Sequence, residues 1–213
     1  MKIQSALYNE FAPFSDFFPE AEKEVVYPED KLDPNGFLII WGGGDIHPSL
    51  YGRPNVASQV GATPSARDFA EVALFKQAQL AGVPIVGVCR GAQLACALNG
   101  GILVQDIDGH FNTHPITTIE GEVVLASSLH HQMMGLWNTK HELFAWTSEP
   151  RSRDYIGITK EELKLIGDIE PEIVYFPESR CLAIQGHPEF VDPFHPFNKL
   201  TRKLLNRYGI ISN

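Results

Sequence analysis

A short cysteine-containing turn constrains the fold of this chain more than any other feature of its sequence. Residues 87–93 read G-V-C-R-G-A-Q and directly follow the apolar run at residues 83–86. This order predicts a buried strand, a sharp turn with Cys89 at its tip, and a helix. Glycines at 87 and 91 flank the cysteine, as expected where strand and helix backbones approach closely. The pattern is that of a nucleophile elbow in which sulfur replaces the serine oxygen.

The helix expected after Cys89 favours nucleophilic chemistry at the sulfur. Unpaired N–H groups at a helix N-terminus carry partial positive charge, which favours a thiolate over a thiol. The N–H group of Arg90 would point toward the negative oxygen that forms when a carbonyl carbon is attacked. The alternative is that Cys89 is a small buried hydrophobic residue, as free cysteines often are.

Length and charge bound the class of protein. The 213 residues suit one domain with a full core, so we expect a single domain over residues 1–213. The net charge of −9 argues against a surface for nucleic acid or anionic membranes. The three cysteines form no disulfide framework and no zinc pattern, which favours a reducing compartment. The sequence shows no signal peptide and no membrane-spanning stretch, so we expect a cytoplasmic protein.

Alternating strands and helices predict the fold class. The apolar residues 37–41 indicate a buried parallel strand that ends in the glycine loop at residues 42–45. A helix is expected at residues 65–81, followed by the strand into the turn at Cys89. The order predicts an α/β fold with an open, mostly parallel sheet, helices on both faces and extra short antiparallel strands. In such sheets the ligand site lies beyond the carboxyl ends of the strands, where the glycine loop and Cys89 both fall.

Further elements are expected along the chain. They are strands at residues 3–8, 25–27, 102–104, 115–119, 121–125, 141–147, 155–159, 172–176 and 181–185, a short helix at 11–20, and a helix at 194–208.

A histidine and a glutamate complete a candidate catalytic set. Pro188 favours an extended conformation at His187, and residues two apart in an extended segment share a face. Glu189 would therefore lie beside His187, fix its tautomer and support its charged form. A histidine oriented in this way can activate a thiol. Taken alone, His187 has a common alternative as a histidine of a surface loop.

Together these motifs resemble the class I (triad) glutamine amidotransferase family. Residues 41–52, W-G-G-G-D-I-H-P-S-L-Y-G, are similar to the Gly-Gly-x-Asp-x-x-Pro-x-x-Tyr-Gly stretch of its gamma-glutamyl hydrolase branch, of peptidase C26 type. That branch includes gamma-glutamyl-gamma-aminobutyrate hydrolases. Residues 89–93, 100–107 and 127–132 fit the same branch, and the resemblance covers residues 37–190. It implies a flavodoxin-like architecture. Trp41 departs from the pattern, because the family usually has proline there.

The resemblance also implies a role for each residue of the motifs. Cys89 is the implied nucleophile, His187 the general base and then acid, and Glu189 the carboxylate that orients it. The implied oxyanion-hole donors are the N–H groups of Arg90 and of Gly43 or Gly44. Gln93 would hold the glutamyl group, the backbone of His131 and Gln132 would bind its amino-acid end, and His130 would support that loop.

Histidines and aspartates between residues 106 and 114 raise the question of a metal. Asp106, Asp108, His110 and His114 match no regular ligand spacing, so we expect loop or scaffold roles for them. His130 and the residue after it are interpreted as part of a loop that lines a pocket. The implied chemistry needs no metal and no cofactor.

Three functions fit these observations. The first is a stand-alone thiol hydrolase that cleaves the gamma-amide of a gamma-glutamyl compound through a glutamyl-thioester. Arg90 favours it, because synthase-linked relatives more often carry an apolar or aromatic residue there. The second is a glutaminase subunit that supplies ammonia to a separate synthase or ligase partner, and the third is a scaffold that binds without catalysis. The expected ligand is a small molecule, with no nucleic acid and no membrane as partner, and a homodimer is compatible with the sequence.

Overall fold

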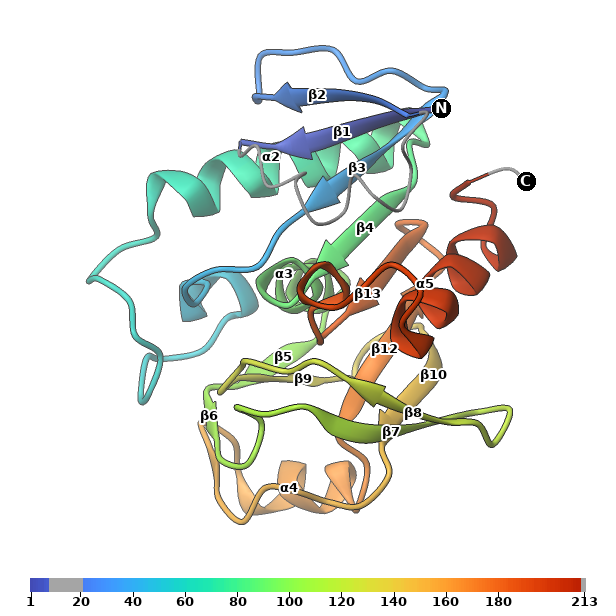
Figure 1. Ribbon diagram of the computed structural model, residues 1–213. Helices are drawn as coiled ribbons and strands as arrows, with labels where there is room; N and C mark the ends of the chain where they lie inside the picture. Colours follow the sequence, from blue (N-terminus) through green and yellow to red (C-terminus); the bar gives the residue numbers. More distant parts are fainter. Residues whose placement is uncertain (8–20, 212–213) are drawn as a thin grey trace.

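A nine-stranded sheet runs through the part of the chain that the computed structural model describes, residues 1–7 and 21–211 (Figure 1). Its strand order is β2-β1-β3-β4-β13-β12-β10-β7-β8. The strands are β1 (Lys2–Ala6), β2 (Glu22–Val26), β3 (Gly36–Ile40), β4 (Ile85–Val88), β7 (His114–Thr118), β8 (Val123–Ala126), β10 (Glu142–Thr147), β12 (Pro171–Phe176) and β13 (Cys181–Ile184).

The sheet has a parallel half and an antiparallel half. Strands β2, β1, β3, β4 and β13 pair in parallel. From β13 onward, β12, β10, β7 and β8 pair antiparallel. The predicted α/β class is confirmed, and the antiparallel strands β7, β8, β10 and β12 continue the main sheet. Two small antiparallel sheets pair β5 (Ile102–Val104) with β9 (Met133–Gly135), and β6 (Asp106–Ile107) with β11 (Tyr155–Ile156).

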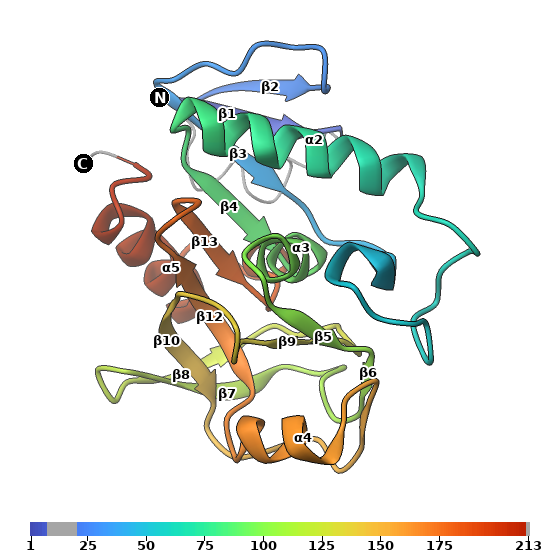
Figure 2. The ribbon, with the colours of Figure 1, turned by 180° about the vertical axis from the view of Figure 1, so that it is seen from behind.

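Helices lie on both faces of the main sheet. In Figure 1 the helix α5 (Pro196–Arg207) lies in front of the sheet and α2 (Ala66–Ala81) behind it, and Figure 2 shows the reverse. Alternate side chains of β3 divide between the two cores. Phe37 and Ile39 pack in the cluster that contains α5, and Leu38 and Ile40 in the cluster that contains α2 and α3 (Arg90–Leu98).

The bounds of α2 follow from its sequence. Ser65 accepts a hydrogen bond from the N–H of Asp68, and the Asp68 side chain accepts one from the N–H of Ser65, which forms a capping box. Gly82 ends the helix in the left-handed conformation. The helices predicted at residues 65–81 and 194–208 therefore agree with α2 and α5 to within two residues at each end.

Other elements differ from the sequence prediction in extent. The strand predicted at residues 155–159 is shorter, with β11 covering Tyr155–Ile156. The structure also contains a short helix α4 (Lys160–Ile166) and two 3-10 turns, η2 (Pro48–Tyr51) and η3 (Pro188–Phe190). The short helix predicted at residues 11–20 lies outside the described residues. Across residues 1–7 and 21–211, none of the helices combines the length and the apolar character needed to cross a bilayer.

The turn between β4 and α3 leaves no room for side chains at its two glycines. A Cβ atom on Gly87 would lie 2.5 Å from the carbonyl oxygen of Gly91. A Cβ atom on Gly91 would lie 2.1 Å from the carbonyl oxygen of Ile40. Because both obstacles are backbone atoms, a larger residue at Gly87 would force β4 and α3 apart, and one at Gly91 would force β3 and α3 apart.

We expect Gly91→Ala to lower the free energy of unfolding by about 1–3 kcal/mol, because it overpacks this turn. Urea unfolding of the purified protein measures the loss. The matched control is Gly61→Ala, whose new Cβ atom would have Thr63 O at 3.9 Å as its nearest neighbour. That variant should stay within about 0.5 kcal/mol of the parent. Equal stabilities of the two variants would contradict the close approach.

Candidate active site

Three neighbouring parallel strands bring the predicted site residues to one edge of the sheet. In register, Ile40 of β3 lies beside Gly87 of β4, and Val88 of β4 lies beside Ile184 of β13. The glycine loop follows β3, Cys89 follows β4, and His187 lies shortly after β13. Because parallel strands point the same way, their carboxyl ends meet, and segments far apart in the chain become neighbours.

Cys89 has a strained backbone that its neighbours hold in place. Its φ of 48° and ψ of −103° are rare for a residue with a side chain. Its N–H donates to the carbonyl oxygen of Ile184 at 2.8 Å, and its own carbonyl accepts from the N–H of Gln93 at 3.0 Å. The side chain precedes the first turn of α3 and makes no capping hydrogen bond. The sulfur therefore lies beside the N-terminus of α3 without making a capping hydrogen bond to it.

Cys89 and His187 flank the same glycine. The position of a Cβ atom on Gly42 lies 2.9 Å from Cε1 of His187 and 3.5 Å from Cβ of Cys89. His187 is buried, and within residues 1–7 and 21–211 its Nε2 atom has no hydrogen-bond partner. The structure thus brings the predicted thiol and imidazole together and leaves Nε2 available for a reacting group.

Glu189 contacts His187 through a different conformation from the one predicted. Oε1 of Glu189 lies 2.7 Å from Nδ1 of His187, so the predicted pair is present. The prediction of an extended segment through residue 189 is wrong, because Pro188–Phe190 forms the 3-10 turn η3. The turn brings the Glu189 carboxylate to Nδ1 of the imidazole and stacks the ring of Phe190 on the imidazole, with centroids 4.4 Å apart and planes 4° apart.

Ser127 holds the backbone of His187 through two hydrogen bonds. The N–H of His187 donates to the carbonyl oxygen of Ser127 at 3.0 Å, and Oγ of Ser127 donates to the carbonyl oxygen of His187. Ser127 stands in the S-S-L-H-H-Q motif at residues 127–132. This positioning role, like that of Phe190, was missed by the sequence analysis, although the motif itself marked the segment.

The charges around His187 favour its protonated form. Burial lowers the pKa of His187, but the Cys89 sulfur and the Glu189 carboxylate outweigh burial and raise it to about 10. The ordinary value for histidine is about 6.5. At neutral pH the arrangement therefore favours an imidazolium beside the sulfur.

Arg67 orients the glycine loop. Nη2 of Arg67 donates to the carbonyl oxygens of Trp41 and Gly42, at 3.2 and 2.8 Å. In a trans peptide the N–H points away from the carbonyl, so the N–H of Gly43 faces the side opposite Arg67. Trp41, at the position where proline is usual, donates from Nε1 to Oγ of Ser5 on β1 at 2.6 Å. These contacts hold the loop that carries two of the predicted oxyanion donors.

The Arg90 side chain turns away from the sulfur into a buried group of charges. Its guanidinium donates to Oδ1 of Asp68 at 2.6 Å and also to Glu71, and Arg67 pairs with the other oxygen of Glu71 at 2.7 Å. Arg90, Asp68 and Glu71 are all at most 2 % exposed. The N–H of Arg90 remains at the start of α3 as predicted, while its side chain ties α3 to α2.

A cavity of about 210 Å³ gathers most of the other predicted residues around Cys89. Its lining comprises Gly43, Gly44, Asp45, Gln59, Cys89, Gln93, Leu129, His130, His131 and Gln132. The predicted oxyanion loop and the predicted glutamyl-binding loop therefore line one cavity together with Cys89.

The loop at residues 129–132 is held by its own hydrogen bonds. His131 lies between Oδ1 of Asp45 at 2.9 Å and Oδ1 of Asp106 at 3.0 Å, and these contacts, led by the one with Asp45, raise its pKa to about 9. The carbonyl oxygens of His131 and Gln132 accept from the N–H of Ile107 at 2.7 Å and from Nε2 of Gln93 at 3.3 Å. Two carbonyl groups of the backbone predicted to bind substrate are thus already hydrogen-bonded to other residues of the protein.

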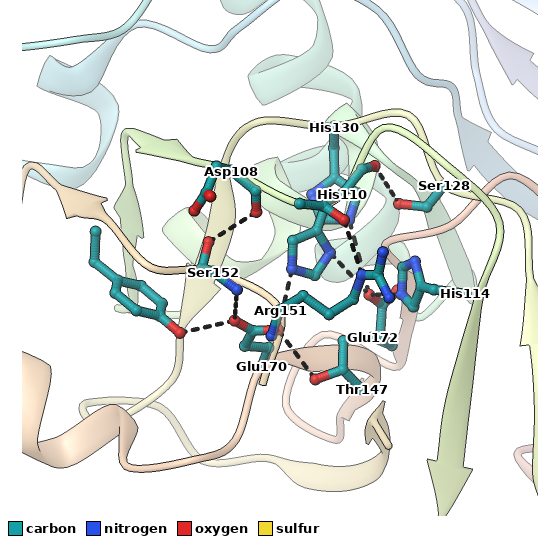
Figure 3. A network of polar contacts seen from close by, with 12 residues as sticks. Asp108, His110, His114, Ser128, His130, Thr147, Arg151, Ser152, Glu170 and Glu172 are labelled. Carbon is teal, nitrogen blue, oxygen red and sulfur yellow. Dashed lines mark hydrogen bonds and ion pairs between the residues drawn. The ribbon is translucent and has the colours of Figure 1, made fainter. Parts of the chain in front are cut away.

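A second buried polar cluster adjoins this loop (Figure 3). His110, His130 and Glu172 form a group that could hold a metal ion, with one ligand atom of each within 4.8 Å of the others. His114 also contacts Glu172, with Nε2 2.8 Å from Oε1. Burial lowers the pKa of His110, but Glu170 and Glu172 raise it to about 9. His110 and His114 therefore belong to a buried cluster with Glu170 and Glu172, which their irregular spacing in the sequence did not predict.

Comparison with known proteins identifies relatives along most of the chain. The family model of Peptidase C26 matches residues 21–134. A provisionally named glutamine amidotransferase of Schizosaccharomyces pombe is 33% identical over 204 residues, which cover 86% of this chain and 75% of the relative. A provisionally named glutamine amidotransferase-like protein of Lactococcus lactis subsp. cremoris is 40% identical over 102 residues, which cover 44% of this chain. The match spans 54% of that lactococcal relative, about half of its length.

Solved structures share the fold at low sequence identity. A provisionally named GMP synthase component from Thermoplasma acidophilum superposes with a TM-score of 0.63 at 15% identity, covering 99% of this chain and 93% of that one. A glutamine amidotransferase from Thermotoga maritima superposes with a TM-score of 0.60 at 10% identity, covering 99% of this chain and 86% of that one. These likenesses concern the fold alone.

We expect Arg90→Met to lower the free energy of unfolding by about 3–5 kcal/mol, because it leaves buried carboxylates with too little positive charge. Chemical unfolding of the variant measures the loss. Lys140→Met is the matched control, since Lys140 and Glu178 form an exposed pair at 3.4 Å. That variant should show no clear loss. If Arg90→Met is as stable as the control, the buried charges do not tie α3 to α2.

Proposed function

Because the chain belongs to the peptidase C26 family of class I glutamine amidotransferase-like proteins, we propose that it is a cysteine-dependent hydrolase of gamma-glutamyl amides. One observation carries the proposal: Cys89 and the His187–Glu189 pair meet across Gly42 at the carboxyl ends of three parallel strands. The cavity beside Cys89 supports it, because both loops that the glutamyl group would need line that cavity.

The first half of the proposed reaction forms a thioester. The Cys89 sulfur attacks the gamma-carbonyl carbon of the substrate, and the carbonyl oxygen becomes an oxyanion. The N–H groups of Arg90 and of Gly43 or Gly44 donate hydrogen bonds to that oxyanion. His187 gives its proton to the leaving amine as the C–N bond breaks, so a free amine departs and the glutamyl group stays on sulfur.

The second half returns the enzyme to its starting state. His187, now neutral, takes a proton from a water molecule, whose oxygen attacks the thioester carbon. The C–S bond breaks, glutamate leaves as a carboxylic acid product, and the sulfur regains its negative charge beside the protonated imidazole. Glu189 holds Nδ1 of His187 throughout, so that Nε2 faces the sulfur, the amine and the water in turn.

The alternative is a glutaminase subunit that supplies ammonia to a separate synthase or ligase. The names of the relatives favour it, since the fission yeast and lactococcal proteins are provisionally named for glutamine amidotransferase activity or likeness. A panel of gamma-glutamyl amides separates the two functions, with glutamine, gamma-glutamyl-aminobutyrate and gamma-glutamyl peptides as members and mass spectrometry as detection. Release of an amine other than ammonia by the purified protein supports the hydrolase. Glutamine hydrolysis only after a synthase is added would replace it.

We expect a glutamine-like diazo-ketone to label Cys89 rapidly and stoichiometrically. Cys89→Ala should lose both the label and all turnover, because it removes the nucleophile. Cys96→Ala and Cys181→Ala are matched controls, since burial raises the pKa of Cys96 to about 12 and also raises that of Cys181. Both should keep the label and turnover, with a loss of stability of about 1–2 kcal/mol. Intact-mass measurement decides, and equal loss in all three variants contradicts the assignment of Cys89.

We expect the alkaline limb of kcat/KM to lie near pH 10, because His187 must keep its proton and its pKa is raised to about 10. Glu189→Gln should move that limb toward lower pH, since it removes a carboxylate that raises this pKa. It should also lower kcat by roughly 10²–10⁴-fold through loss of the oriented imidazole. Glu178→Gln, an exposed carboxylate, should leave the profile unchanged. An unchanged profile in Glu189→Gln would show that another acid orients the histidine.

A further inference from the structure

Three buried side chains that each carry an unpartnered polar atom gather beside the loop at residues 129–132. The atoms are Nδ1 of His110, Nε2 of His130 and Oε2 of Glu172, none of which has a hydrogen-bond partner within residues 1–7 and 21–211. Their side chains are at least nine-tenths buried, with exposures of 0, 4 and 1 %. Buried polar atoms are rarely left unpaired, so unpartnered atoms on three neighbouring side chains indicate a site that binds a ligand.

Hydrogen bonds fix each imidazole with a free nitrogen toward Glu172. Nδ1 of His130 lies 2.9 Å from the carbonyl oxygen of Gln132, which can only accept, so Nδ1 carries the proton. Nε2 of His110 lies 3.1 Å from Oε2 of Glu170, so Nε2 is the donor in that ring. The opposite nitrogens lie 3.8 and 3.6 Å from Oε1 of Glu172, which is too long for a hydrogen bond.

Glu170 is itself held as an acceptor. Its donors are Tyr155 at 2.7 Å, the N–H of Ser152 at 2.8 Å, Thr147 at 3.0 Å and the N–H of Arg151 at 3.0 Å. Figure 3 shows this shell around Glu170, with His110 above it and His114 on the other carboxylate. A histidine whose second nitrogen donates to a fixed carboxylate or carbonyl is the usual arrangement of a metal ligand.

We propose that His110, His130 and Glu172 bind one divalent transition-metal ion, for which Zn²⁺ is the best match. Two imidazole nitrogens and one carboxylate oxygen form a three-ligand set that leaves a fourth position for water. The charge of the ion offsets the two carboxylates buried side by side, Glu170 and Glu172. Because Zn–N bonds are about 2.0–2.1 Å long, the ion draws the three ligand atoms closer than they lie here.

The three proposed ligands come from separate segments of the chain, so their spacing in the sequence does not match a regular metal-site pattern. His110 follows β6, His130 lies between β8 and β9, and Glu172 belongs to β12. The ion would tie two loops to the antiparallel half of the sheet. It therefore has a structural role, holding the loop that lines the cavity next to Cys89. The competing occupants are a proton on Nδ1 of His110 and a buried water molecule.

The test begins with the Cys89→Ala protein, because Cys89 and His187 could themselves capture Zn²⁺. Chelator-treated protein is titrated with Zn²⁺ by calorimetry and with Co²⁺ by visible absorption. We expect one equivalent of each ion per chain and a rise in Tm with Zn²⁺. X-ray absorption at the zinc edge should show nitrogen and oxygen ligands with imidazole scattering and no sulfur. Absence of saturable uptake and of a Tm shift would overturn the proposal in favour of a proton or water.

Variants in the same background locate the ion. Glu172→Gln and His110→Gln should weaken Zn²⁺ binding by more than about 100-fold, because each removes a ligand. Glu170→Gln should weaken it by about 10–100-fold, as expected for a residue that only orients a ligand. His141→Gln is the control, since His141 contacts Thr139 outside the cluster. Unchanged binding in Glu172→Gln and His110→Gln overturns the site. If those variants do not fold, the titration and zinc-edge spectrum of the parent decide.

Discussion

The close approach of three backbones at the end of β4 is the constraint on which the rest of the structure depends. Gly91 lies against the carbonyl oxygen of Ile40 and Gly87 against that of Gly91, so β3, β4 and α3 are packed without intervening side chains. Between these two glycines Cys89 has a φ of 48°, and the hydrogen bond from its N–H to Ile184 helps to hold it. The strain is therefore borne by the sheet and by the helix, and the sulfur projects over the edge where the parallel strands end.

The proposed base is positioned by contacts from two directions. The backbone of His187 is paired with Ser127, a residue from the antiparallel half of the molecule, while its ring is paired with Glu189 and stacked on Phe190. Because these contacts come from separate segments, the imidazole can keep one orientation while the substrate, the amine and water exchange at Nε2. The raised pKa of His187 follows from the same enclosure, since two negative partners outweigh the cost of burial.

Two buried groups of charged and polar side chains connect the elements around the cavity beside Cys89. In one group Arg90 joins α3 to α2 through Asp68 and Glu71, and in the other the histidines around Glu172 join the loop at residues 129–132 to β12. The two groups differ in the source of their positive charge. Arg90 and Arg67 supply it to the carboxylates near α2. Glu170 and Glu172 have His110 and His114 as partners, and there a bound cation would replace the proton that otherwise charges His110.

Local pattern was enough to predict the strand–turn–helix around Cys89, the bounds of α2 and α5 to within two residues, and the contact between His187 and Glu189. These features depend on residues close in sequence: glycines that permit tight packing, caps that end helices, and a glutamate two residues from a histidine. The 3-10 turn at Pro188–Phe190, the inward path of the Arg90 side chain and the convergence of His110, His130 and Glu172 were decided only by the tertiary structure. Each depends on partners distant in the chain or on the space left beside a neighbouring strand, and no periodicity or spacing within one segment carries that information.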